Sequence, residues 1–454
     1  MHQALGRESH ATATYYNEAL ASAGKYAEAL AGFKSGLRYL NAEDMDDGSR
    51  AVVMKLIADT QYNLHYPEKK VKWLQRLLDL GLDRNSEAVD LYDIRITLSY
   101  ELTHQYRFEE SEAVLLGVKA DYPRVGTRIC NAFGFLYLVW DQFSKSEEWL
   151  QRGIALSPRD QSNLHLNLSN LHLKLGRLQS AKHLIVAYLR TTALNVHDKA
   201  YALASLARLC LEREKFNKAG QLLARAAILD KKWASDTYQQ GRRLLFAGML
   251  SLEIGRFEQA EAELTVSLGN YSLLKIVESP IFASSRLAEA YLLQGKVQEA
   301  EACLASNGEA LERAKHSTAA ACLFEMQGRV CLAKQELVQA RDWLDKALAI
   351  QEPLLPGTKA TARTYSALGC LELAAGRHSE AYERFTQAVQ IQGRAVAAAE
   401  AYSGLAELYV RVEDWQSAQA CLHAVLPLFQ SLPAHPMACK LQLQLQALPA
   451  NPLT

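Results

Sequence analysis

Proline and glycine are scarce in this sequence of 454 residues, with 11 and 24 occurrences respectively, and this composition argues against a disordered chain. Basic and acidic residues balance at 50 each, so no net field draws the protein to nucleic acid or to an anionic membrane. No apolar run reaches 18 residues, and the amino-terminal MHQALGRESH lacks the apolar region of a signal peptide. We therefore expect a folded cytoplasmic protein that binds neither nucleic acid directly nor membranes.

The sequence patterns of common catalytic and cofactor sites are also missing. No phosphate-binding G-x-x-x-x-G-K-[ST], hydrolase G-x-S-x-G, metalloprotease H-E-x-x-H or EF-hand loop occurs. The eight cysteines include no C-x-x-C pair, whereas a zinc site or a disulfide framework needs clustered cysteines. These absences favour a protein that is not an enzyme, has no cofactor or metal, and keeps its cysteines as free packing residues.

Two features are candidates for metal binding, and the second of them is also a candidate for contact with a basic partner. The 12 histidines are dispersed, and His165, His172 and His183 form the nearest thing to a cluster. However, the chain contains a repeated segment, and several of its copies have tyrosine or cysteine at the position equivalent to His172, which favours a packing role. The acidic stretch Glu43–Asp47 does not have the spacing of a calcium loop, which favours a solvated linker.

What the sequence does contain is one segment in many near-copies. They include GKYAEALAGF at 24–33, GRFEQAEAEL at 255–264, GKVQEAEACL at 295–304 and GRHSEAYERF at 376–385. The first residue of the segment, here called the turn mark, recurs every 35 to 41 residues, at positions 24, 65, 106, 141, 176, 214, 255, 295, 335, 376 and 413. A fixed period of this length is typical of a repeat protein.

Three columns at fixed distances from the eleven turn marks test this register. Five residues after the mark, ten of eleven residues are Ala or Ser, with Lys70 as the exception. Nine residues after it, all eleven are large and apolar. Seven residues before it, ten of eleven are small, with Asn17 as the exception. Small residues let helix backbones approach and large apolar residues fill the core, so each unit is predicted to be helix A, a short turn and helix B.

Glycine at five of the marks provides a tight left-handed end to helix A. At other marks the residue is polar, as at Glu214, Gln335 and Glu413, and such residues are less favourable in that conformation.

This pattern resembles the tetratricopeptide repeat family. The match is best in CNAFGFLYLVW at 130–140, followed by SKSEEWL, and in YSALGCLELAAGRHSEAYERFTQAV at 365–389. The resemblance implies an all-α fold, a right-handed superhelix (α-solenoid) of about eleven antiparallel helix pairs over residues 9–430. It leaves residues 1–8 as an amino-terminal arm and residues 431–454 as a capping helix and tail. The family's small–aromatic–small–aromatic signature is represented by Gly134, Tyr137, Ser146 and Leu150.

The resemblance also implies which residues line the concave groove, namely those 13, 10, 9 and 6 positions before each turn mark. Amide side chains can bind a peptide backbone, Arg and Lys can bind a carboxylate, and Phe246 and Met249 offer an adaptable apolar pocket. The alternative is that a solvated inner face simply needs polar residues. Lys174 is added because it lies one helical turn after Asn170. The predicted partner-binding residues are Arg128, Asn131, Asn163, Asn167, Asn170, Lys174, Tyr201, Arg208, Arg242, Phe246 and Met249.

Later units change in character at the same positions. Glutamates appear there mixed with arginines, which predicts a groove that is mixed or acidic toward the carboxyl terminus. The residues are Glu289, Glu325, Glu400 and Glu407 with Arg286, Arg329 and Arg363.

Two functions follow from these expectations. The first is a noncatalytic protein-interaction scaffold that binds an extended peptide or a partner protein in the concave groove. The alternative is a sensor domain of a bacterial transcriptional regulator that binds a small molecule or a signalling peptide. The repeat length of about 40 residues is similar to that in MalT-type activators, peptide-sensing bacterial regulators and kinesin light chains. No helix-turn-helix or ATPase segment is recognisable beside the repeats.

Overall fold

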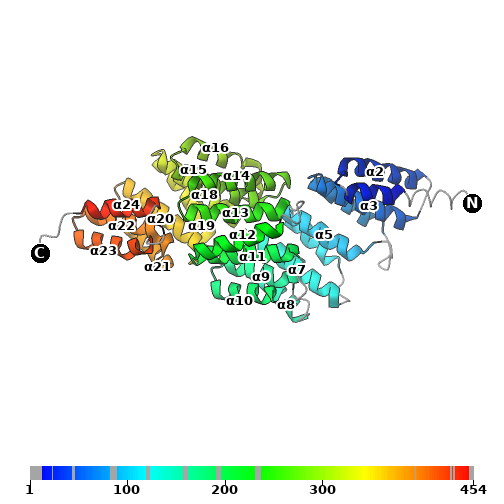
Figure 1. The fold of residues 1–454 in the computed structure, drawn as a ribbon, viewed down its shortest axis with the longest axis horizontal. Helices are drawn as coiled ribbons and strands as arrows, with labels where there is room; N and C mark the ends of the chain where they lie inside the picture. The colour runs from blue at the N-terminus through cyan, green and yellow to red at the C-terminus, as the bar shows by residue number, and fades with distance from the viewer. Residues whose placement is uncertain are drawn as a thin grey trace, which may run out of the picture. The chain divides into compact units, whose positions relative to one another are not determined.

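The structure, a computed structural model, describes residues 13–22, 24–42, 46–81, 89–118, 123–156, 162–190, 196–230, 237–393, 395–429, 432 and 435–448. All regular structure in these ranges is helical, and they contain no strand. The chain divides into two compact units. Unit 1 comprises residues 1–164 and 273–276, and unit 2 comprises residues 165–272 and 277–454. Within each unit the helices stack as pairs (Figure 1), as the repeat predicts.

Unit 1 begins with a helix over residues 13–22, which is followed by the B helix of the same pair, α2 (Tyr26–Ala42). The later pairs of unit 1 are α3 (Asp47–Asn63) with α4 (Pro67–Asp79), α5 (Leu91–His104) with α6 (Phe108–Leu116), and α7 (Pro123–Val139) with α8 (Phe143–Leu156).

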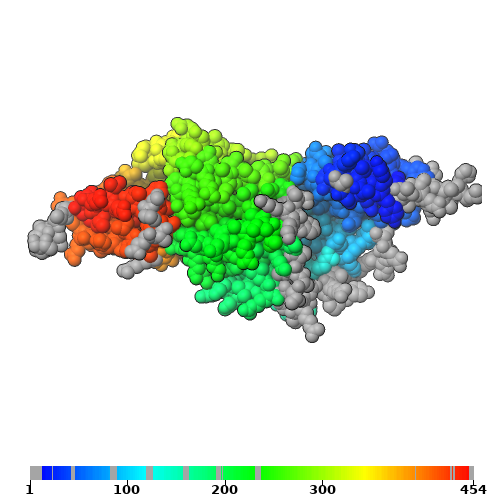
Figure 2. Space-filling view, in the orientation of Figure 1, coloured from blue at the N-terminus to red at the C-terminus, as the bar shows by residue number. Residues whose placement is uncertain are grey.

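Unit 2 continues the same alternation, and its neighbouring repeats lie against each other in chain order, from green to red (Figure 2). The division between the units falls inside α9 (Ser162–Lys174), which pairs with α10 (Leu178–Leu189). The following pairs are α11 (Val196–Glu212) with α12 (Phe216–Asp230), α13 (Thr237–Glu253) with α14 (Phe257–Leu273), α15 (Glu278–Leu293) with α16 (Val297–Ala305) and α17 (Gly308–Ala314), α18 (Thr318–Ala333) with α19 (Leu337–Leu354), α20 (Lys359–Ala374) with α21 (His378–Gln392), and α22 (Ala399–Arg411) with α23 (Trp415–Val425).

The three sequence columns form the contact between helix A and helix B. Every column residue is buried, and the small residue before the mark faces the large residue after it. A Cβ atom added to Gly134 or Gly248 would lie 2.4 Å from Leu150 or Leu264 respectively. Because real side chains do not approach so closely, the small residue is what lets the two helices pack at this distance. The predicted register is therefore confirmed.

The turn marks share one backbone conformation. All eleven have a positive φ, including the six that are not glycine. At Gly255 the preceding helix ends with two backbone hydrogen bonds, from Gly255 N to Leu252 O at 3.1 Å and from Arg256 N to Ser251 O at 2.8 Å, which is the usual pattern of a left-handed helix end. The non-glycine marks are His65, Tyr106, Asp141, Glu214, Gln335 and Glu413.

We expect Gln335→Gly to raise the free energy of unfolding by roughly 0.5–1 kcal/mol. A left-handed conformation strains a residue with a Cβ atom, and this gain exceeds the extra chain entropy that glycine loses on folding. Gln335 is exposed, so little packing is lost. Urea unfolding measures the change. Glu214→Gly is the matched comparison and should gain less, because the Glu214 carboxylate is bonded elsewhere; equal gains at both positions would contradict this explanation.

Contacts between distant repeats are a second feature of unit 2. The Glu214 carboxylate, at the turn after α11, accepts hydrogen bonds from the backbone N–H groups of Val396 and Ala397 at 3.0 and 2.9 Å. Val396–Ala398 is a 3-10 helix that leads into α22, so Glu214 satisfies amide donors at the entrance to a helix 182 residues away. Lys359 and Glu253 form a similar long-range ion pair at 2.7 Å.

The predicted ends and linkers lie partly outside the described residues, as do the arm over residues 1–8 and the acidic residues Glu43–Met45. Asp46 caps α3 by accepting a hydrogen bond from Ser49 N at 2.9 Å. Near the carboxyl terminus, α24 (Pro436–Gln446) packs through buried Leu441 into the core formed by α22 and α23. Of the helices that the structure describes, none is long and apolar enough to cross a membrane.

Candidate functional site on the A helices

Three consecutive A helices of unit 2 bring several of the predicted residues together. Asn170 on α9 donates a hydrogen bond from Nδ2 to the Tyr201 hydroxyl of α11 at 3.0 Å. Arg242 on α13 donates from Nη2 to the Tyr201 carbonyl at 2.7 Å and to Ser205 Oγ at 3.3 Å. Its guanidinium carbon also lies 3.3 Å from the centre of the Tyr201 ring, a cation–π contact. Tyr201 is therefore the centre of this cluster.

Arg208 on α11 and Arg242 on α13 both lie near one aromatic ring, that of Phe246 on α13. Their guanidinium carbons are 5.9 and 5.7 Å from the centre of the Phe246 ring. Phe246 is only 6% exposed, so it supports the two arginines and is not the open apolar pocket that the sequence predicts. Met249 is half-buried beside the same core.

Neither arginine has a carboxylate partner within the described parts of the chain. Arg242 is buried, and its Nε atom has no hydrogen-bond partner there. Arg208 is half-buried and makes no hydrogen bond or ion pair with any described residue. Burying positive charge without a counter-ion costs free energy. Arg208 and Arg242 therefore carry positive charge that no described carboxylate pairs with.

The later A helices are charged but compensated. A charged ladder of three arginines and three glutamates crosses four of them, and is defined as Arg286 and Glu289 on α15, Glu325 and Arg329 on α18, Arg363 on α20 and Glu400 on α22. Arg329 bonds Glu400 with both terminal nitrogens, at 2.7 and 2.9 Å, and also bonds Glu325. Arg363 lies 2.9 Å from Glu289.

The titration of the ladder glutamates follows from this pairing. Burial raises the pKa of Glu289, but the charges of Arg363, Arg286 and Arg329 outweigh burial and lower it to about 2. Burial likewise raises the pKa of Glu400, and Arg329 more than offsets this, so that the pKa falls below its ordinary value. Glu289 and Glu400 are therefore held in their charged form, and the ladder contains equal numbers of arginines and glutamates.

The other predicted residues have internal partners or lie in unit 1. Lys174 pairs with Glu278 of α15 at 3.2 Å, a partner 104 residues away that no repeat period reveals. Asn167 is half-buried and also has a partner. In unit 1, Asn131 donates to the Tyr100 hydroxyl at 2.7 Å. Arg128 forms an exposed ion pair with Asp93, and Asn163 is exposed.

The packed core contains His165 and His172 and contacts Cys303 and Cys421, whereas His183 and Cys439 are exposed. His165 and His172 are buried, and no group of three His, Cys, Asp or Glu gathers as metal ligands would among the residues searched in the described structure. Burial raises the pKa of the Cys303 and Cys421 thiols to about 11. Such thiols remain protonated near neutral pH and are poor nucleophiles.

A family model and the solved structure of a Rap protein agree with this fold. Residues 319–393, which span α18 to α21, match the family model described as tetratricopeptide repeat. No curated protein matches the chain in sequence. The solved structure of a Rap protein complexed with competence and sporulation factor shares 12% identity, covering 78% of this chain and 100% of that chain with a TM-score of 0.55. The Cut9–Hcn1 hetero-tetramer of APC/C shares 12% identity over 95% of both chains with a TM-score of 0.41. Residues 319–393 therefore match the tetratricopeptide repeat family, and the other described helices stack in pairs of the same kind.

Proposed function

We propose that this protein is a noncatalytic interaction scaffold that binds a peptide or partner protein by a carboxylate, at Arg208 on helix α11. The observation that carries the proposal is a difference between arginines on equivalent helices. Arg286, Arg329 and Arg363 are each paired with glutamate, whereas Arg208 has no ion pair with any described residue. A partner's carboxylate would supply the missing counter-ion.

The two arginines have different roles in this proposal. Arg208 is half-buried, so its guanidinium retains access to solvent and can bind a carboxylate with two parallel hydrogen bonds. Arg242 is buried and held by the Tyr201 carbonyl and Ser205. It adds positive potential behind Arg208 without direct contact. Asn170 contributes by holding Tyr201 in place.

The comparisons are compatible with a bound polypeptide. The Rap protein with a similar fold is, in its solved structure, complexed with competence and sporulation factor, so a fold of this kind accommodates a bound factor in that case. A sensor module, the second hypothesis, would use Arg208 for the carboxylate of a small molecule or signalling peptide. Free amino acids and dipeptides are therefore tested as competitors of the selected peptides.

The test is a selection from a bead-displayed library of ten-residue peptides, half with a free terminal carboxylate and half amidated. We expect the bound peptides to be enriched in Asp, Glu or the free carboxylate. Arg208→Ala should then weaken binding of the selected peptides about tenfold to a hundredfold in fluorescence anisotropy, because a charged hydrogen bond contributes about 1.5–3 kcal/mol. Arg208→Lys should fall between, since lysine keeps the charge but not the two-pronged geometry.

Arg225→Ala is the matched control. Arg225 is exposed on the B helix α12 of the same repeat, so this variant changes the net charge equally without touching the proposed site. Selected peptides without carboxylate enrichment, or equal affinity of Arg208→Ala and the unaltered chain, would rule out this site.

A further inference from the structure

The first repeat of unit 1 has an open pocket where other repeats place a tryptophan. Eight residues after the turn mark stand Trp73, Trp149 and Trp343 in three repeats, but Gly32 in the first. Three residues further on, Arg76, Arg152 and Lys346 lie over those tryptophan rings, at 5.1, 5.1 and 4.2 Å from the ring centres. The first repeat has Ser35 there. Both the ring and the cation above it are therefore missing.

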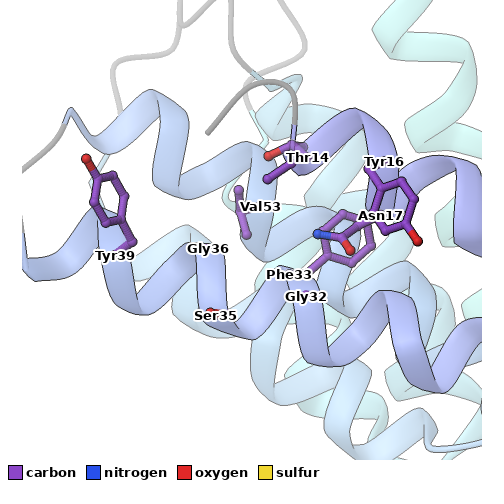
Figure 3. A pocket seen from close by; sticks show the side chains of 10 residues that line it. Thr14, Tyr16, Asn17, Gly32, Phe33, Ser35, Gly36, Tyr39 and Val53 are labelled. Atoms are coloured by element: carbon purple, nitrogen blue, oxygen red, sulfur yellow. The ribbon is translucent and has the colours of Figure 1, made fainter. Parts of the chain in front are cut away.

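The missing indole leaves a cavity of about 350 Å³ beside α2. Tyr16, Asn17 and Phe33 lie at one end of the pocket and Tyr39 stands at the other (Figure 3). Engineered cavities of about 150 Å³ already bind benzene, so this space is ample for an indole ring.

The pocket wall keeps an aromatic surface for such a ring. Tyr16 stands eight residues before its turn mark, at the position that Phe133 occupies in the fourth repeat. There, Phe133 stacks on Trp149 with ring centres 4.4 Å apart. In the first repeat the corresponding tryptophan is replaced by Gly32, and Tyr16 is 65% exposed.

A buried polar group also faces this space. Asn17 is only 9% exposed, lines the pocket and has no hydrogen-bond partner in the described part of the chain. Its side chain lies over Gly32, where a Cβ atom would collide with it. Because no described group bonds this side-chain amide, it is available to a ligand in the pocket. An indole N–H or a peptide N–H is a suitable donor to the Asn17 side-chain oxygen.

From these observations we infer that the pocket of the first repeat binds a tryptophan side chain of a partner polypeptide. The ring takes the place that the array itself gives to tryptophan in other repeats, stacked on Tyr16, and Asn17 bonds the indole or the adjoining peptide group. This site is independent of the carboxylate site proposed at Arg208.

The experiment uses the full chain and the probe N-acetyl-5-fluorotryptophan amide, followed by fluorine NMR. We expect saturable line broadening of the probe. Tyr16→Ala should weaken binding about threefold to tenfold, in line with the loss of one aromatic pair. Tyr15→Ala is the matched control, because Tyr15 is the neighbouring exposed tyrosine and does not line the pocket; its affinity should equal that of the unaltered chain.

A second variant refills the pocket. The double substitution Asn17→Ala with Gly32→Trp removes the collision and restores the tryptophan of the other repeats, and it should abolish probe binding while the circular dichroism spectrum stays helical. Absence of saturable binding, or undiminished binding to the refilled variant, would overturn the inference. Equal displacement by N-acetyl-leucine amide would overturn an aromatic occupant. Self-association in sedimentation that the refilled variant loses would instead identify the occupant as a second copy of this chain.

Discussion

Replacing Arg329 with methionine is expected to lower the free energy of unfolding by about 3 kcal/mol. The Glu325 side chain is only 4% exposed, and the substitution removes its bonded guanidinium along with both hydrogen bonds to Glu400. Breaking a buried ion pair from one side is costly because the remaining charge stays buried, and Glu325 would keep only the longer contact with Arg363 at 3.5 Å. Urea unfolding followed by helical circular dichroism measures the loss.

The control for this result is a double variant that balances the charges of the ladder again. Arg329→Met combined with Glu400→Gln restores equal numbers of arginines and glutamates and should recover a large part of the lost stability. Arg313→Met removes the same kind of cation from an exposed pair with Glu309 and should cost less than about 1 kcal/mol. Similar losses for Arg329→Met and Arg313→Met would show that the ladder is not a buried network.

Replacing Lys70 with alanine is expected to cost about 3–5 kcal/mol, although alanine is the commonest residue in its column. Lys70 and Glu101 are both buried, and Lys70 Nζ lies 2.9 Å from Glu101 Oε1. The lysine ammonium also lies 4.4 Å from the centre of the Tyr62 ring. Truncation to alanine leaves Glu101 as an unpaired buried charge. The repeat pattern alone predicts a harmless change, so thermal and urea unfolding distinguish the two views.

The double variant Lys70→Ala with Glu101→Leu separates the loss of the ion pair from the loss of packing. Replacing a buried pair by apolar residues is often neutral or stabilising, so the double variant should be clearly more stable than Lys70→Ala. If Glu101→Leu instead adds its own loss to that of Lys70→Ala, the pair is not what stabilises this repeat.

Local features of this fold could be predicted from the sequence because each repeat is a helix pair with the same contacts. The left-handed conformation at the turn marks, including Gln335, and the contact of Gly248 with Leu264 follow from residues within one repeat. The exceptions at Asn17 and Lys70 were visible as breaks in columns. Gly32 makes room for the Asn17 side chain and Glu101 pairs with Lys70. Both residues stand at positions outside the three columns.

The candidate site was predictable only in part. Their positions in the repeat place Arg208 and Arg242 on adjacent A helices. The repeat does not show which arginines form ion pairs. Pairing of Lys174 with Glu278 depends on how tightly the stack of helices winds, and a repeat period contains no information about winding. Burial of Phe246 beneath two guanidinium groups likewise depends on the three-dimensional contact between α11 and α13.

The bond between Glu214 and the entrance to α22 has a consequence for how unit 2 unfolds. A solenoid whose repeats contact only their neighbours can fray from its ends, one repeat at a time. Glu214 and the pair Lys359–Glu253 connect repeats far apart in sequence, and these connections form only after long loops have closed, which slows folding. The repeats between these connections unfold together. Unit 2 therefore unfolds cooperatively, as a globular domain does, although its repeats are stacked in one dimension.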